Sequence, residues 1–528
     1  MRQVSVSSLK QSAVIYLSLP VLFFCAGMLR LSVAIPSTVA VLFALWRVLA
    51  ALRRDTDRSP CDEDRKLPVL TVALFFTGAL ALCILCGQFG ICVQKWDWFS
   101  RNATFRDLLT HPWPVIYPQH ENMGMAFYFG HWLPPAAVGR GVYILTGSLD
   151  IAWRIGNVLL GLWTASGVSL AFLLVAVGVR ARSFRPAVLV LAVCMSFSGC
   201  FFIGKLFLSL KAVVLGGEWP LTWANWAWGT GTWSGLFQFT HNFGLLAWVF
   251  HQSVVPWIAT ALLFGNRCRW NHAIFIVALV PICGPFPAVG LAWIVMFMLF
   301  RDWMRAVGAG RMAAFVKSLL TIPNLVGVCV VTPLVAALLC TNSATGQVVP
   351  AWHDVTPRMF FFHRWMLFVT AEVGIFAVVL LRRNWREPEY WAVFLSLSLC
   401  PLLKIGPSCD FCMRASIPGL FAVMIMSIDY LLNAHGRSLV GRCILGICLS
   451  VGAVAVGYDA VGVLYQTAVR RAHRQSVACD PLYTYDRDLK AFPVRDASDR
   501  LIVEFSNHFY CKDPQHTLFF KYLARSCR

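Results

Sequence analysis

Charged residues are scarce in this chain. Of its 528 residues, 13% are Asp, Glu, Lys or Arg, whereas 58% are hydrophobic and 14% are aromatic. An average soluble protein carries roughly 25% charged residues, so about half of the usual solvating charge is missing here. Too few charges remain to cover the surface of a soluble protein of this size. The composition therefore excludes a soluble enzyme, a nucleic-acid-binding domain and a fibrous or disordered protein.

The sequence also lacks the common motifs of nucleotide, hydrolase and metal chemistry. It contains no GxxxxGK[ST], GxSxG or HExxH motif, so nothing favours ATP-driven transport or a common hydrolase. Most of its 19 cysteines lie inside apolar runs, where a thiol behaves as a small hydrophobic side chain. Cys409 and Cys412 have no second pair at zinc spacing. No metal ligands are predicted.

Long apolar runs, by contrast, recur along the whole chain. A helix of about 20 apolar residues crosses a bilayer core. The runs fall near 12–29, 31–52, 67–92, 150–178, 186–203, 243–264, 271–284, 286–300, 318–340, 366–381, 389–403, 416–433 and 441–464. The two runs beside Pro281 and Pro285 are short, and we expect a broken or re-entrant pair there. The pattern predicts an all-α, polytopic integral membrane protein with about 11 to 13 membrane-spanning helices.

Basic residues indicate the orientation of these helices. The 45 Lys and Arg residues exceed the 25 Asp and Glu residues, and the dense basic clusters lie in alternate loops. The positive-inside rule places those loops in the cytoplasm, and it favours the bilayer over nucleic acid as the partner of this charge. Four loops then lie on the extracytoplasmic side: 93–149, 204–242, 341–365 and 404–415. We expect a transmembrane domain over 1–464 and a small extracytoplasmic segment over 465–528.

The first of these outer loops has a distinct layout. Asp97 lies about five residues beyond the end of an apolar run. The spacing of residues 98–110 predicts a short helix lying in the membrane interface, which the prolines after His111 would end. Pro134 and Pro135 then lead into the next apolar stretch.

This layout resembles the GT-C class of membrane glycosyltransferases, in which an acidic residue just past a span opens the first large outer loop. The resemblance implies that Asp97 is the catalytic carboxylate. It would take the proton of an acceptor hydroxyl that attacks the anomeric carbon of a sugar on polyprenyl phosphate. Some members of the class use a divalent metal, and the resemblance leaves that cofactor open. The alternative for Asp97 is a surface acid paired with Lys95 or Arg101.

A second informative segment precedes the apolar run at 416–433. It contains Lys404, Asp410 and Arg414, the last two one helical turn apart. GT-C enzymes generally use basic residues near a late span to bind the donor phosphate. The resemblance therefore implies that Arg414, with Lys404, holds that phosphate, which a guanidinium can bind bidentately. The alternative is an ordinary Asp–Arg pair beside the start of a helix.

Further side chains are candidates for the substrate pocket, and aromatic surfaces over 96–132 and 219–233 are candidates for stacking on sugar rings. The pocket candidates are Trp98, Asp107, Asp410, His241 and His251. Polar groups inside apolar runs are costly unless they are paired or face a cavity. The alternatives are a salt-bridged helix residue for Asp107, hydrogen bonding between helices for the histidines, and an interfacial aromatic belt for the tryptophans.

The resemblance implies a function for the whole chain. We expect a glycosyltransferase that moves a sugar from a polyprenyl-phosphate donor to a glycan or lipid acceptor on the extracytoplasmic face. Such a protein would lie in the cytoplasmic (inner) membrane of a bacterium and serve cell-envelope polysaccharide synthesis. The alternatives are a transporter or flippase of lipid-linked saccharides, which would show two similar halves, a polysaccharide polymerase or ligase, and a non-catalytic assembly subunit.

Overall fold

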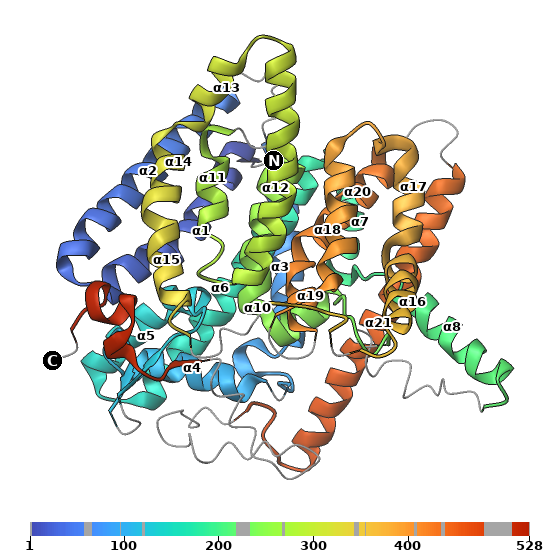
Figure 1. Ribbon diagram of the computed structural model, residues 1–528. Coiled ribbons are helices and arrows are strands. Elements are labelled where there is room, and N and C mark those ends of the chain that lie inside the picture. The colour runs from blue at the N-terminus through green and yellow to red at the C-terminus, as the bar shows by residue number, and fades with distance from the viewer. Residues whose placement is uncertain are drawn as a thin grey trace.

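The computed structural model describes eleven stretches of the chain. They are 3–57, 66–95, 97–118, 122–217, 233–266, 270–342, 348–353, 355–405, 409–433, 439–479 and 509–526. Helices make up nearly all of the regular structure in these stretches, and the few strands have two or three residues each (Figure 1). The protein is an all-α polytopic membrane protein, as the composition predicts.

Nine helices of the described chain are long and apolar enough to cross a membrane. Two of them are interrupted by a π-helical turn, a third ends in one, and another has a break before Ile417. They are α1 (Val6–Met28), α2 (Leu31–Asp57), α6 (Leu149–Gly178), α10 with η4 (Asn242–Thr260, Ala261–Gly265), α12 (Pro285–Gly308), α14 with η5 and α15 (Ile322–Val326, Gly327–Val331, Thr332–Leu339), α16 with η6 and α17 (Arg358–Val369, Thr370–Gly374, Ile375–Asn384), α19 with α20 (Asp410–Ala415, Ile417–Asn433) and α21 (Leu439–Ala472).

The remaining apolar runs form shorter helices. They are α3 (Val69–Leu85), α7 (Phe184–Ser196), α11 (Trp270–Ala278) and α18 (Pro388–Leu399). Helix α7 is followed by α8 (Phe201–Val214) after a bend of 48°, and the bent pair would count as a tenth span. Every predicted apolar run is therefore helical, and the predicted count of 11 to 13 includes helices that are too short to cross alone.

A broken pair of helices is expected near Pro281 and Pro285, and only the first helix of that pair is short. Helix α11 stops at Ala278 and the chain turns, whereas α12 begins at Pro285 and continues for 24 residues as a full-length helix. Proline is favoured in the first turn of a helix, where its missing N–H is not needed. The turn between the helices accepts a hydrogen bond at the Ile282 carbonyl from the Gly130 amide, 3.1 Å away, and so contacts the first outer loop.

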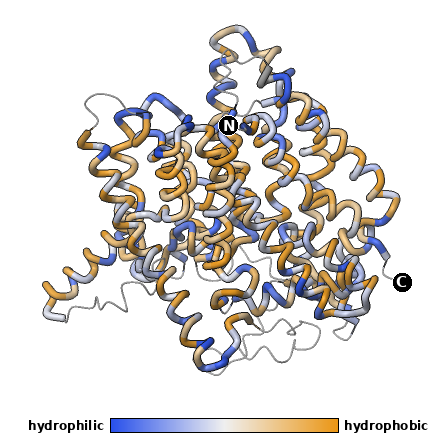
Figure 2. The backbone as a smooth tube through the Cα atoms, turned by 180° about the vertical axis from the view of Figure 1, so that it is seen from behind, coloured by the Kyte–Doolittle hydropathy of each residue, from blue (hydrophilic) through white to orange (hydrophobic). Residues whose placement is uncertain are grey.

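Hydrophilic segments gather at the two ends of the bundle, and hydrophobic residues dominate the helices between them (Figure 2). The lower end in Figure 1 carries the first outer loop, the start of α10 and helix α19. The upper end carries the basic turn between α12 and α13 (Met312–Leu319). Loops that the charge pattern assigns to opposite sides thus lie at opposite ends of the bundle.

The first outer loop folds into helices and a small sheet. Its elements are α4 (Trp98–Thr110), β3 (Ile116–Tyr117), β4 (Met123–Met125), η3 (Gly130–Trp132) and α5 (Leu133–Thr146). The predicted helix over 98–110 is confirmed, and it ends because His111 is extended before a proline. It differs in burial from the expected interfacial helix, because ten of its residues, Arg101 among them, are buried.

Strand pairing connects distant parts of the described chain at three places. Strand β7 (Tyr510–Cys511) pairs antiparallel with β4 and extends the sheet to the order β3-β4-β7, so residues 509–526 pack against the first outer loop. Strands β5 (Val349–Pro350) and β6 (Leu403–Lys404) pair antiparallel and join the third and fourth outer loops. At the N-terminus β1 (Gln3–Ser5) pairs with β2 (Lys66–Pro68).

Candidate functional site

Two largely buried Asp–Arg ion pairs form the candidate site. In the first ion pair, Arg101 Nη2 donates to Asp97 Oδ2 at 2.8 Å, and the side chains are 7% and 18% exposed. In the second ion pair, Arg414 Nη1 lies 2.5 Å from Asp410 Oδ2, and the side chains are 12% and 34% exposed. Both pairs have i, i+4 spacing, which places the partners on one face of α4 and of α19.

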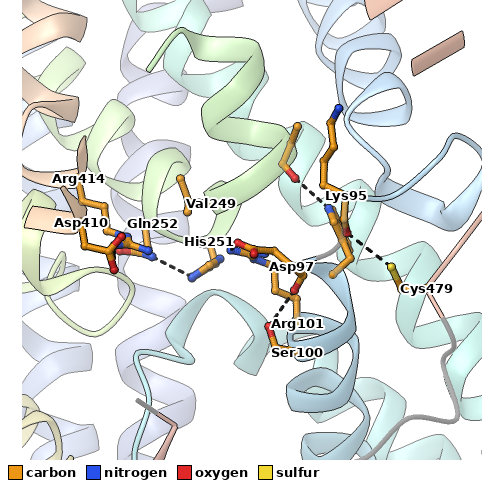
Figure 3. A network of polar contacts seen from close by, with 12 residues as sticks. Lys95, Asp97, Ser100, Arg101, Val249, His251, Gln252, Asp410, Arg414 and Cys479 are labelled. Carbon is orange, nitrogen blue, oxygen red and sulfur yellow. Dashed lines mark hydrogen bonds and ion pairs between the residues drawn. The ribbon is translucent and has the colours of Figure 1, made fainter. Parts of the chain in front are cut away.

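Tyr128 and His251 lie within electrostatic range of both ion pairs. The charges of all four paired side chains act on the Tyr128 hydroxyl, and both arginine charges act on His251. Figure 3 shows the two pairs on opposite sides of two polar side chains of α10, His251 and Gln252. The fold therefore brings together residues more than 300 positions apart in the sequence.

Helix α10 presents these polar side chains at a kink. Val249 has φ −138° and ψ 39°, which is not helical, and His251 and Gln252 lie two and three residues after it. Gln252 Nε2 lies 3.2 Å from His251 Nε2. An amide N–H that donates to Nε2 leaves the imidazole proton on Nδ1. The imidazole is held between aromatic rings, stacking with Trp132 at 4.5 Å and with Tyr128 at 5.6 Å between ring centroids.

Several polar atoms of this site are buried without a hydrogen-bond partner among the described residues. They are Arg101 Nε and Nη1, Arg414 Nε, His251 Nδ1 and Gln252 Oε1. Leaving a buried donor or acceptor unsatisfied costs about 1–3 kcal/mol, and more for a charged group. Such groups are rare in folded proteins and require a partner such as a ligand or water. Most of these atoms are N–H donors, and this favours a ligand rich in acceptor oxygens.

Tyr128 keeps its hydroxyl proton in this environment. Burial is the main cause that raises the pKa of Tyr128, the nearby Arg414 charge lowers it, and the Asp410 charge raises it again. The hydroxyl therefore remains a hydrogen-bond donor at neutral pH, where it adds to the donors of the two guanidinium groups.

The structure places Trp98 and Asp107 in packing roles. Trp98 is 1% exposed, its ring stacks on Phe250 at 5.0 Å between centroids, and its Nε1 donates to the Ala247 carbonyl at 2.9 Å. Trp98 therefore packs α4 against α10, and its ring is too deeply buried to stack on a sugar. Asp107 is fully buried and accepts a 2.8 Å hydrogen bond from Tyr117. Ten residues of helix separate it from Asp97, about 15 Å along α4.

His241 and Lys404 belong to other parts of the same end of the bundle. His241 caps α10 by accepting from the Gly244 amide at 2.9 Å, and its Nε2 lies 3.2 Å from Asp459 Oδ2 of α21. His241 therefore makes the interhelical contact that the sequence analysis gave as the alternative to a pocket role. Lys404 lies in β6 opposite Val349.

The predicted aromatic surfaces are described only in part. Trp96, His120, Glu121 and residues 218–232 lie outside the described residues. Trp233 is nine-tenths buried, and its Nε1 donates to Glu372 of η6 at 2.7 Å. Trp132 is fully buried against His251, so it holds that ring in place.

Sequence reasoning missed the site roles of Arg101 and Tyr128. The i, i+4 spacing of Asp97 and Arg101 is visible in the sequence, and it supported only the alternative of a surface pair. The burial of Arg101 depends on the packing of α4 against α10 and the chain at Cys479, which no local pattern reports. Tyr128 is one of several aromatic residues in its loop and has no sequence feature that sets it apart.

The described side chains form no site for a divalent metal. In the eleven described stretches, no three His, Cys, Asp or Glu side chains come together as metal ligands. Asp97 and Asp410 each bind an arginine through Oδ2. Both carboxylates are therefore already engaged by a cation of the protein itself.

Comparisons with known proteins give no match. No family model, no curated protein and no solved structure matches this chain. The function must therefore be inferred from the residues and their geometry.

Proposed function

We propose that this protein is a GT-C-like glycosyltransferase that uses a polyprenyl-phosphate-linked sugar. It would act at the extracytoplasmic face of a bacterial cytoplasmic membrane, on a glycan or lipid acceptor used for cell-envelope polysaccharide. The observation that carries the proposal is the position of two largely buried Asp–Arg pairs on opposite sides of His251, with guanidinium N–H groups left unsatisfied within the described chain (Figure 3).

The unsatisfied donors favour a phosphate as the ligand. Guanidinium groups match phosphate oxygens with paired N–H donors, and such charge-assisted bonds are about twice as strong as neutral ones. The site lies at the outer-loop end of apolar helices, where the phosphate of a membrane lipid is also found. A lipid-linked donor satisfies both conditions, because it carries phosphate oxygens at the end of a long apolar chain.

Asp97 supplies the base that a glycosyl transfer requires. Its carboxylate is oriented by Arg101 and remains 18% exposed, so an acceptor hydroxyl can reach it. In the transfer, the acceptor oxygen forms a bond to the anomeric carbon while its proton passes to Asp97. The bond from the anomeric carbon to the phosphate oxygen breaks, and its electron pair leaves with the phosphate next to an arginine.

An assay of the purified protein in lipid nanodiscs with lipid-linked sugars tests this mechanism. Asp97→Asn should lower kcat by at least about 100-fold, which is the lower end for a lost general base. The chain offers a matched control, because Asp150 and Arg154 form an i, i+4 pair that is 68% and 76% exposed. Asp150→Asn should transfer sugar at the wild-type rate.

Two results would count against the proposal. Full transfer by Asp97→Asn would remove Asp97 from the base role. Absence of transfer with every lipid-linked sugar, together with movement of those lipids across a vesicle bilayer, would show a transporter instead.

A further inference from the structure

The exposed apolar face of α12 continues from the middle of this membrane span to the last turn of the helix. Its members are Val289, Met296, Phe300, Trp303 and Val307, all of them exposed. They follow one another at spacings of seven, four, three and four residues, which places them on one face of the helix. Because the outer surface of a membrane-spanning bundle faces lipid, the lipid-facing surface of α12 extends as far as Val307.

The end of α12 reaches the boundary of the bilayer core. From Pro285 to Val307 the helix rises about 33 Å, at about 1.5 Å per residue. The hydrocarbon core of a bilayer is about 30 Å thick. The turn at 309–311 then leads into α13, at the upper end of the bundle in Figure 1. Helix α13 therefore begins at the level of the lipid headgroups.

Helix α13 has one apolar face and one polar face. The apolar face consists of Met312, Phe315, Val316 and Leu319, at the three- and four-residue spacing of a helix. Ala314 and Lys317 lie on the opposite face. No residue of α13 is buried, and Val316 is exposed. A helix of this kind at the end of a span lies in the plane of the membrane, with its apolar face at the boundary between headgroups and acyl chains.

Positive charge predominates around this helix. Between 285 and 321 the chain has four basic residues and a single acidic residue, Asp302. The Asp302 carboxylate accepts hydrogen bonds from Arg301 Nε at 2.6 Å and from Trp270 Nε1 at 2.8 Å, so it is already engaged. Arg311, directly before α13, and Lys317 within it are both exposed. Such a basic surface at the headgroup level is complementary to anionic lipids.

We propose that α13 is a membrane-surface anchor that binds anionic phospholipid of the cytoplasmic leaflet. Its apolar face packs against the acyl chains, and Arg311 and Lys317 bind the lipid phosphates. The lipid-facing surface of α12 is continuous with this position, which is why the occupant is lipid. The anchor lies at the opposite end of the bundle from the two Asp–Arg pairs, so it does not depend on the function proposed above.

Photocrosslinking of the full-length protein identifies what covers α13. The purified protein with Val316→p-benzoylphenylalanine is placed in nanodiscs that contain equal amounts of phosphatidylglycerol and phosphatidylcholine. Irradiation should add the mass of one lipid to the protein. Phosphatidylglycerol should be captured at least about fivefold more often than phosphatidylcholine, which corresponds to about 1 kcal/mol for one basic residue. Ala314→p-benzoylphenylalanine, on the opposite face, is the matched control and should capture less lipid of either kind.

Charge variants test the selectivity for anionic lipid. Arg311→Gln combined with Lys317→Gln should lower the ratio of phosphatidylglycerol to phosphatidylcholine adducts at Val316 to about one, while lipid is still captured. Arg154→Gln removes an exposed positive charge of α6 and should keep the ratio of the wild type. Melting curves show whether each variant is folded, and Leu319, on the same face as Val316, is a second position for the probe.

Three results would overturn the inference. Equal capture of lipid from Val316 and Ala314 would show that α13 does not rest on the membrane by its apolar face. Equal capture of the two lipids at Val316, with Arg311 and Lys317 in place, would show that these residues do not select an anionic headgroup. An adduct of Val316 with a second protein in native membranes, in place of lipid, would show that the face is a protein-docking surface.

Discussion

At the scale of single residues, the most unusual feature is Arg101, which is charged and 7% exposed. A buried ion pair contributes little net stability, because desolvating two charges offsets their attraction. Removing one partner is costly, however, since the other charge remains buried alone. A role in ligand binding therefore explains the first ion pair better than a role in protein stability.

This asymmetry gives a prediction for the first ion pair. Asp97→Asn should lower the free energy of unfolding by about 3–5 kcal/mol, because Arg101 stays buried without its counter-charge. Asp150→Asn, in the exposed pair, should cost no more than about 1 kcal/mol. Unfolding in a denaturing detergent measures both.

A double variant checks the cause. Asp97→Asn with Arg101→Gln leaves no isolated charge, so it should be more stable than Asp97→Asn alone. If the double variant is the less stable of the two, the cost does not come from the unpaired guanidinium.

His131 predicts how stability depends on pH. Burial lowers the pKa of His131 to about 3. The Thr164 hydroxyl donates its proton to the Leu160 carbonyl, so His131 Nε2 must be the donor to Thr164. Nδ1 is therefore unprotonated, and no acceptor among the described residues would bind a proton added there. In the unfolded chain a histidine has a pKa near 6.5. Between about pH 3 and pH 6.5 the unfolded chain therefore binds a proton at His131 that the folded protein does not.

The contribution of uncharged His131 to the free energy of unfolding is therefore fully present above pH 6.5 and is lost as the pH falls toward 3. Between pH 6.5 and 5 the loss should approach about 2 kcal/mol, at 1.36 kcal/mol per unit. Melting curves of the wild type and His131→Gln at several pH values measure it. The difference between the two proteins isolates His131 from other groups, including the neighbouring His251. A parallel pH dependence would contradict this assignment.

At the scale of elements, close packing of α12 against α19 fixes the position of the second ion pair. Gly290 of α12 lies against the Ala415 carbonyl, directly after Arg414, and a Cβ there would overlap that oxygen. A backbone oxygen in a helix cannot rotate away as a side chain can. The small residue in α12 therefore decides how close α19 lies.

Gly290→Ala should consequently destabilise the protein by about 1–3 kcal/mol, as overpacking does, and should lower transfer activity by shifting Arg414. Gly446→Ala is the control, because no atom of the described residues lies within 4 Å of a Cβ at that position of α21. It should leave stability unchanged or raise it slightly. Equal losses for the two variants would show that the contact with Ala415 is not the cause.

At the scale of the whole molecule, the arrangement of helices predicts which loops share a side of the membrane. Helix α5, which ends at Thr146, lies at the lower end of Figure 1, whereas α12 and α13, which are joined by the turn that contains Ala309, meet at the upper end. Both residues are exposed. The basic clusters assign the Ala309 side to the cytoplasm.

Thiol labelling tests this sidedness. In a background in which the native cysteines, the exposed Cys329, Cys340 and Cys443 among them, are changed to serine, Thr146→Cys should react with a membrane-impermeant thiol reagent added outside intact cells. Ala309→Cys should react only after the membrane is opened. Labelling of both positions from one side would refute the arrangement of the spans.

The class of the protein and most of its helices follow from the sequence alone. Low charge and long apolar runs permit only a bundle of membrane-spanning helices, and prolines after His111 mark where α4 ends. These are local properties, since hydropathy and proline geometry act over one helix at a time. The i, i+4 pairs at Asp97 and Asp410 are visible for the same reason.

Which of these residues lie together depends on the packing of the helices. The packing of α4, α10 and α19 brings the two ion pairs to Tyr128 and His251, buries Arg101, and places Trp98 and His241 in packing and capping roles. Contacts between residues hundreds of positions apart depend on how helix faces fit together, and a single sequence records the faces without their partners. The site is therefore a property of the assembled bundle.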